Sequence, residues 1–145
     1  MRDTPTRRDF LAAGAGVAAL AAAPRFAFGQ AAATFRIGSL CPISGGGSSY
    51  GSGMQKAIEI ALADVNGDGG AGGRKLELFS EDSQTKPEAA VLAAKKLIEV
   101  NKVQAILGTW SSGVTLAVMP LTDAANIIEM NTSGAPAIST LDTKD

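Results

Sequence analysis

The chain has 145 residues, of which 46% are hydrophobic and 19% charged, with 13 basic and 14 acidic side chains and no histidine. This length allows one ordinary domain. The missing histidine excludes mechanisms that need an imidazole as a general base or metal ligand near neutral pH. The balanced charge offers no basic surface for nucleic acid, and a single cysteine, Cys41, excludes an internal disulfide and a thiolate cluster. We therefore expect no metal ion, no cofactor and no nucleic-acid partner.

Residues 1–31 have the composition of a cleavable export signal. Arginines precede the apolar run 11–23, and small residues spaced for cleavage follow it. The run is shorter than the roughly 20 residues of a membrane-spanning helix. Residues 6–12, TRRDFLA, resemble a twin-arginine signal, with a general secretory signal as the alternative. Cleavage after Gly29 and cleavage after Ala31 both fit, and removal of the signal would leave a mildly acidic, exported protein.

After residue 34, short apolar runs alternate with stretches of helical period, a pattern typical of a parallel α/β sheet. The expected strands are 35–41, 76–80, 103–107 and 127–130, and the expected helices are 54–65, 87–100 and about 112–125. Residues 42–53, rich in glycine and serine, are expected to form an irregular loop. Asn66 and Gly67 are expected to end the first helix in the left-handed conformation. The fold class predicted is α/β, with a doubly wound parallel sheet.

Two of the expected helices have an apolar face that should pack against the sheet. The first expected strand ends at Cys41. The face of the first helix comprises Met54, Ala57, Ile58, Ala61, Leu62 and Val65. The face of the second comprises Ala90, Val91, Ala94, Leu97 and Ile98. We expect Cys41 to be buried, because an unpaired thiol exposed in an oxidising compartment is a liability.

Two glycine-rich matches to known motifs are better explained as a turn. Residues 67–72, GDGGAG, have the spacing of a dinucleotide fingerprint, but they follow a helix and precede a strand, the reverse of the required order. Residues 64–69, DVNGDG, match the first half of a calcium loop, but Lys75 stands where that loop needs a bidentate glutamate. The sequence therefore predicts a plain loop here.

The loops after three of the strands carry the candidate binding residues, because open α/β sheets bind ligands at the carboxyl ends of their strands. These loops contain Ser48, Ser49 and Tyr50, then Thr109, Trp110, Ser111 and Ser112, then Asn131, Thr132, Ser133 and Gly134. Hydroxyls and free N–H groups at a helix start favour an anion. These loops contain no Lys or Arg, which favours a carboxylate or a neutral polar group over a phosphate. Alternatively, Ser111 or Ser112 is only the N-cap of its helix.

The same segments resemble the N-terminal lobe of periplasmic solute-binding proteins that serve ABC importers of branched-chain amino acids and related amides. The resemblance covers residues 34–145 and rests on the order of FRIGSLCPISGGGSSYGSGMQKAIEIALADVNGDGGAGGRKLEL, EDSQTKPEAAVLAAKKLI, VQAILGTWSSGVTLAVMPL and NTSGAPAIST. It implies that residues 32–145 are part of the first of two α/β lobes that close on a ligand. It also implies a monomeric, non-enzymatic protein that delivers an amino acid, an amide or a small organic acid to a membrane permease.

The resemblance also implies roles for individual residues. By position, an aromatic contact falls on Tyr50 and the serine that holds the ligand carboxylate falls on Ser112. Gly134 stands in place of a threonine, so it keeps the N–H donor and loses the hydroxyl. Trp110 narrows the site or stacks on the ligand, so an aromatic acid or amide fits as well as leucine or valine. The candidate ligand-binding residues are Tyr50, Trp110, Ser111, Ser112, Thr132, Ser133 and Gly134.

Two other functions stay open at this point. A small enzyme would use Ser112 as nucleophile with Asp82 as partner, but the chain has no GxSxG elbow and no histidine to activate a serine. A truncated remnant that binds nothing is the other alternative. Because the resembling lobe continues beyond Asp145, we expect this chain to form half of a site and to be too short to close on a ligand.

Overall fold

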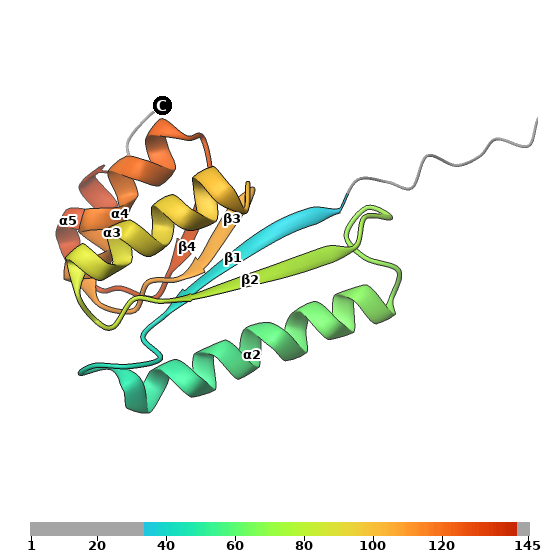
Figure 1. Cartoon of the computed structure of the whole chain (residues 1–145), viewed down its shortest axis with the longest axis horizontal. Coiled ribbons are helices and arrows are strands. Elements are labelled where there is room, and N and C mark those ends of the chain that lie inside the picture. Colours follow the sequence, from blue (N-terminus) through green and yellow to red (C-terminus); the bar gives the residue numbers. More distant parts are fainter. Residues whose placement is uncertain (1–33, 142–145) are drawn as a thin grey trace, which may run out of the picture. The chain divides into compact units, whose positions relative to one another are not determined.

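The computed structural model describes residues 34–141, which contain a four-stranded parallel sheet in the order β2-β1-β3-β4 (Figure 1). The expected signal peptide, residues 1–31, lies outside these described residues and stays a prediction. The strands are β1 (Phe35–Cys41), β2 (Leu76–Asp82), β3 (Ala105–Gly108) and β4 (Ile128–Asn131). All three strand pairings are parallel, and the first strand lies inside the sheet with later strands on both sides of it. The predicted α/β class with a doubly wound sheet is confirmed.

Helices cover both faces of the sheet. Helix α2 (Ser48–Gly67) lies on one side, whereas α3 (Pro87–Lys95) and α4 (Ser112–Ala124) lie on the other (Figure 1). A π-helical turn, Lys96–Val100, continues α3, so the predicted helix 87–100 is confirmed in extent. A short helix, α5 (Pro136–Leu141), follows β4. The sequence pattern does not predict α5, because six residues are too few to show an apolar period.

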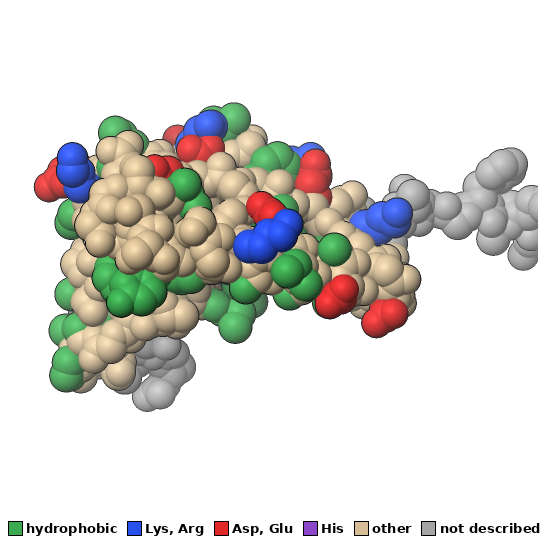
Figure 2. All heavy atoms as spheres, turned by 90° about the horizontal axis from the view of Figure 1, so that it is seen from below, with side chains coloured by type: hydrophobic (Ala, Val, Ile, Leu, Met, Phe, Trp, Pro, Cys, Tyr) green, Lys and Arg blue, Asp and Glu red, His purple; other side chains and the backbone are tan. Residues whose placement is uncertain are grey.

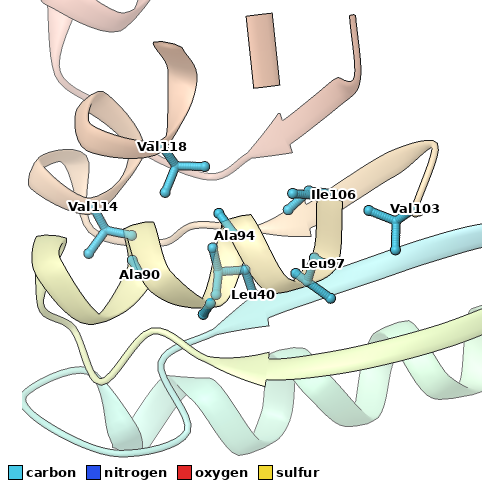
Figure 3. Close-up of a cluster of buried hydrophobic side chains, with 9 residues drawn as sticks. Leu40, Ala90, Ala94, Leu97, Val103, Ile106, Val114 and Val118 are labelled. Atoms are coloured by element: carbon cyan, nitrogen blue, oxygen red, sulfur yellow. The ribbon is translucent and has the colours of Figure 1, made fainter. Parts of the chain in front are cut away.

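The hydrophobic core lies between the sheet and the helix pair α3–α4 (Figure 3). Leu40, Leu97 and Ile106 have no exposed surface. Gly38 makes room for Leu97, since a Cβ at this position would lie 3.0 Å from Leu97 Cδ1. Of the face predicted for residues 87–100, Ala90, Ala94 and Leu97 are buried and Val91 and Ile98 are half-buried. One sealed core therefore joins β1, β3, α3 and α4.

Helix α2 begins earlier than the glycine-rich sequence predicts. The expectation of an irregular loop over residues 42–53 is wrong from Ser48 onward, because α2 begins there and its first turn contains Tyr50. Gly51 explains the difference, since a Cβ at this position would lie 1.9 Å from the carbonyl oxygen of Pro42. The glycine that looked like a loop signal allows the first turn of the helix to contact the preceding backbone.

The predicted left-handed conformation of Asn66 and Gly67 is wrong, although the helix does end at Gly67. Both residues are helical, and the Asn66 side chain forms two hydrogen bonds with the backbone of Leu76, at 2.7 and 2.8 Å. Asn66 thus ties α2 to the start of β2. The left-handed residues come later, at Gly69 (φ 96°) and Gly70 (φ 83°), in the turn that the sequence does predict.

The α2 side of the sheet is less completely packed than the α3–α4 side. Of the apolar face predicted for residues 54–65, Leu62 is buried and Met54 and Ile58 are half-buried, but Ala57, Ala61 and Val65 are exposed. Among the described helices, α2 alone lies on this side, so much of its apolar surface has no neighbour. Figure 2 views this side and shows hydrophobic side chains at the surface between charged ones.

β1 has the predicted bounds, and the ends of the other three strands differ from prediction by no more than two residues. β2 runs two residues further, to Asp82, and β3 begins two residues later than expected, at Ala105. Cys41 is fully buried, as predicted, and this burial raises the pKa of its thiol to about 11. Within residues 34–141, no helix has both the length and the apolar character to cross a bilayer.

Candidate functional site

The carboxyl ends of the strands lie at one end of the sheet (left in Figure 1). An aromatic pair joins the first turn of α2 to the segment that follows β3. The rings of Tyr50, in the first turn of α2, and Trp110, after β3, stack with centroids 5.0 Å apart and planes 23° apart. Trp110 also covers Gly47, where a Cβ would lie 2.8 Å from the indole. Tyr50 is 58% exposed, so the pair leaves aromatic surface open to solvent, and ligand contact there stays a prediction.

The loop between β3 and α4 begins with a sharp turn. Gly108 and Thr109 both have positive φ, 120° and 43°. Glycine is needed at 108, because a Cβ there would lie 2.7 Å from the carbonyl oxygen of Leu40. The backbone N–H of Thr109 donates to that same carbonyl oxygen at 2.9 Å, which fixes the loop to the end of β1.

Helix α4 begins immediately after this turn, with Ser111 in the N-cap position. Ser111 has extended backbone angles, but its side chain makes no capping hydrogen bond. The first turn of α4 also contains no acidic residue that would compete with an anion. Because the first N–H groups of a helix have no intrahelical partner, those of Ser112 and Gly113 are suited to bind an anion. Ser111 thus occupies the N-cap position that the alternative predicts, but without a capping hydrogen bond from its side chain, and its contact with a ligand stays a prediction.

Ser133 connects the loop after β4 to the loop after β3. Its hydroxyl donates to the carbonyl oxygen of Thr109 at 2.8 Å, with the Trp110 carbonyl oxygen at 3.2 Å and Thr115 Oγ1 at 2.5 Å. The structure thus brings Ser133 beside Trp110, but with its hydroxyl engaged in the protein. The neighbouring Thr132 and Gly134 are exposed. Ligand contact at these positions stays a prediction.

Glu129 is a polar group at this edge that sequence reasoning missed. It lies in β4, where its Oε1 accepts a hydrogen bond from Thr109 Oγ1 at 3.0 Å and its Oε2 accepts one from Thr122 Oγ1 at 2.9 Å. Burial raises the pKa of Glu129 above the ordinary value of 4.5, against the opposing effect of the two hydroxyl hydrogen bonds. The available signal was a charged residue between Ile128 and Met130 in a short strand.

Asp82, the partner required by the enzyme hypothesis, serves a different purpose. Its carboxylate accepts hydrogen bonds from Ser44 Oγ at 2.6 Å, Ser44 N at 3.1 Å and Gln84 N at 2.8 Å. Burial acts to raise the pKa of Asp82, but its hydrogen bonds together outweigh burial and hold the pKa below 3.8. These contacts tie the loop after β1 to the loop after β2, and they engage the Asp82 carboxylate with Ser44 and Gln84.

A cavity of about 290 Å³ lies beside the candidate site, between α4, β4 and α5. It is lined by Met119, Pro120, Thr122, Asp123, Ile127, Glu129, Asn131 and Ile138. None of the seven candidate ligand-binding residues is among them, so the cavity and the candidate site are different places. Within the described residues, no cluster of three or more His, Cys, Asp or Glu side chains is arranged to hold a metal ion.

The chain is similar in sequence to curated bacterial binding proteins. The chain is 34% identical over 97 residues to Leu/Ile/Val-binding protein homolog 7 of Brucella suis, an overlap of 67% of this chain and 24% of that protein. It is 32% identical over 92 residues to an amino acid binding protein of Pseudomonas aeruginosa, an overlap of 63% of this chain and 25% of that protein. The chain thus spans about a quarter of the length of these curated relatives.

Two solved structures have a similar fold. The branched-chain amino acid transporter substrate-binding protein LivJ of Streptococcus pneumoniae, in complex with isoleucine, matches with a TM-score of 0.71 and 25% identity over 74% of this chain and 31% of its own. A solute-binding protein of Rhodopseudomonas palustris, in complex with 3,4-dihydroxybenzoic acid, matches with a TM-score of 0.67 and 29% identity over 74% of this chain and 29% of its own. The family model described as periplasmic binding protein matches residues 34–144, so the chain belongs to the periplasmic binding protein family.

Proposed function

We propose that this chain supplies the first-lobe contacts of an extracytoplasmic solute-binding protein that serves an ABC importer, and that its solute is a small carboxylate with an apolar body. The function is binding and presentation, without catalysis. The observation that carries this proposal is the N-terminus of α4, which begins at Ser112 without a side-chain cap and directly follows Trp110 of the stacked aromatic pair.

The charge of the site favours a single negative charge on the solute. The helix dipole and the free N–H groups of the first turn stabilise an anion, and the hydroxyls of Ser111 and Ser112 add donors. The loops 42–53, 109–112 and 131–135 contain no Lys or Arg. A phosphate ester, which carries up to two charges, would lack the cations that commonly accompany it.

The aromatic pair favours a flat or branched apolar group next to the carboxylate. Tyr50 and Trp110 present ring faces that bind apolar and aromatic bodies. The two solved structures support this class, since isoleucine and 3,4-dihydroxybenzoic acid each combine a carboxylate with such a body. We therefore place branched-chain amino acids and aromatic acids in one proposed class.

The proposal includes export and a membrane partner. Residues 1–31 would direct the chain to the periplasm, with cleavage after residue 29 or 31. The permease of the importer would then be the protein partner, and the binding protein itself would be monomeric. These features rest on the export-type sequence of residues 1–31 and on the family.

A thermal-shift comparison of paired ligands tests the proposed class. Isoleucine is compared with isoleucinamide, and 3,4-dihydroxybenzoate with its primary amide, on the purified chain. Bound ligand stabilises the native state by RT ln(1 + [L]/Kd), so at least one carboxylate should raise Tm and its amide should not. Equal shifts for both members of each pair, or none, would contradict the proposal. Trp110→Ala is the control and should abolish the shift.

A further inference from the structure

We propose that Glu129 is a positioning residue for the candidate ligand-binding loop. Its carboxyl group holds Thr109 in the left-handed conformation, and Thr109 in turn holds Trp110 and the start of α4 in place. This inference rests on the proposed function, because the loop that Glu129 positions is the loop proposed to contact the solute.

Thr109 is the central residue of a hydrogen-bond network that joins three segments. Its N–H donates to Leu40 O at 2.9 Å, and its carbonyl oxygen accepts from Ser133 Oγ at 2.8 Å and Thr115 Oγ1 at 3.1 Å. Thr109 has no exposed surface and a φ of 43°. A β-branched residue keeps this unfavourable conformation only where its surroundings hold it there.

Glu129 provides the contact that fixes the Thr109 side chain. Thr109 Oγ1 donates to Glu129 Oε1 at 3.0 Å, while Glu129 Oε2 accepts from Thr122 in α4 at 2.9 Å. One carboxyl group therefore links β4, the loop after β3 and α4. Without it, the Thr109 hydroxyl would be buried without this partner, which strongly favours a different arrangement of the loop.

A change in the position of Thr109 would also move Trp110, a residue of the proposed ligand-binding surface. Trp110 is the next residue, its carbonyl oxygen lies 3.2 Å from Ser133 Oγ, and its ring stacks on Tyr50. Trp110 is also the single tryptophan of the chain. Its fluorescence therefore reports the position of this loop in the absence of any ligand.

The test compares Glu129→Val, which removes both acceptors, with Glu129→Gln, which keeps the shape and one oxygen acceptor. Trp110 emission and acrylamide quenching are measured on the full chain without ligand, with far-UV circular dichroism as a check of folding. We expect Glu129→Val to shift the emission to the red and to increase quenching. Glu129→Gln should stay close to the wild type, and the exposed Glu99→Val should leave both quantities unchanged.

Thr109→Val and Thr109→Ser repeat the comparison if Glu129→Val does not fold, since only serine retains the hydroxyl. Wild-type emission and quenching in a folded Glu129→Val or Thr109→Val protein would overturn the proposal. Equal changes in the conservative and the apolar variants would also overturn it. The fluorescence test uses no ligand, so its outcome does not depend on whether the chain binds one. Conversely, the thermal-shift comparison of ligand pairs still tests the proposed solute class if Glu129 proves not to position the loop.

Discussion

The two sides of the sheet differ in how completely their apolar surface is buried. On the α3–α4 side, Leu40, Leu97 and Ile106 have no exposed surface. On the α2 side, Ile60 is 51% exposed, and Gln55 of α2 forms hydrogen bonds with serines of β1 and β2, Ser39 and Ser80. Because buried apolar area supplies most folding free energy, the stability of the described fold resides mainly on the α3–α4 side.

The two aromatic residues of the candidate site belong to elements on opposite sides of the sheet, which differ in how well they are packed. Trp110 belongs to the loop that enters α4, and the Thr109 N–H connects that loop to the backbone of Leu40, a residue of the hydrophobic core. Tyr50 belongs to α2, whose first turn lies close to the backbone of Pro42 at Gly51. We therefore expect the loop that contains Trp110 to be more rigid than the first turn of α2, which contains Tyr50. The Tyr50 side of the site should be the first to lose its structure when the protein is destabilised.

Core substitutions should show the largest contrast between the two sides. Leu97→Ala leaves a cavity in the sealed core and should lower the free energy of unfolding by about 3 kcal/mol. Ile60→Ala, on the exposed surface of α2, should change it by about 0.5 kcal/mol or less. Urea denaturation measures the free energy of unfolding of both variants. Similar decreases for the two variants would contradict the proposed difference in packing between the two sides of the sheet.

Two glycines of α2 provide the next test. Gly51→Ala places a Cβ 1.9 Å from Pro42 O and should cost about 2 kcal/mol. It should also weaken the near-ultraviolet dichroism of the Tyr50–Trp110 pair. Gly53 meets no atom within 4 Å, so Gly53→Ala should be neutral or stabilise α2 by up to about 1 kcal/mol. A tolerated Gly51→Ala would show that this close approach does not restrict the start of α2.

The pH dependence of stability tests the burial of Glu129. Its pKa in the folded state is raised above 4.5, so the native protein binds this proton more tightly than the unfolded chain. The resulting stability is fully present below the unfolded pKa and is lost as the pH rises through the folded pKa. Relative to Glu129→Gln, the wild type should therefore lose unfolding free energy as the pH rises from about 4.5, until Glu129 is ionised. A difference that is constant or grows in favour of the wild type would contradict this assignment.

The smallest expected effect is at Gly134. A Cβ here meets no atom within 4 Å, so Gly134→Thr should fit and add a hydroxyl donor for a carboxylate. One hydrogen bond of about 1 kcal/mol corresponds to roughly fivefold tighter binding. Gly134→Val, which has the same shape without the hydroxyl, is the control. Equal affinities for the threonine and valine variants would show that the solute carboxylate does not reach this position.

The fold was largely predictable because the relevant signals are local. Alternating strands and helices dictate a parallel sheet, and the period of residues 87–100 identifies the helix that covers the core. The wrong predictions lie where a contact between residues far apart in the sequence determines the local conformation. Gly51 favours a loop in the sequence, and only the nearby backbone of Pro42 explains why it begins a helix. Asn66 favours a left-handed helix end, and only its hydrogen bonds with Leu76 explain why it stays helical.

The candidate site was predictable to the level of loops and not of individual partners. Parallel strands place Tyr50, Trp110 and Ser133 at one edge, and their mutual contacts follow in the structure. Whether a hydroxyl forms a hydrogen bond within the protein depends on side-chain positions. The hydrogen bond from Ser133 to Thr109 could therefore not be predicted from the sequence. Glu129 was missed for the same reason, since its two threonine partners come from different segments.

The most direct test of the central claim is a ¹⁵N–¹H NMR titration of the chain with a carboxylate and its matching amide. If a small carboxylate binds at the start of α4, the backbone amides of Ser112, Gly113 and Val114 and the Trp110 indole N–H should shift saturably with isoleucine or 3,4-dihydroxybenzoate. The corresponding amides should leave these resonances unchanged. Saturable shifts confined to the cavity between α4, β4 and α5, or identical shifts with carboxylate and amide, would contradict the account.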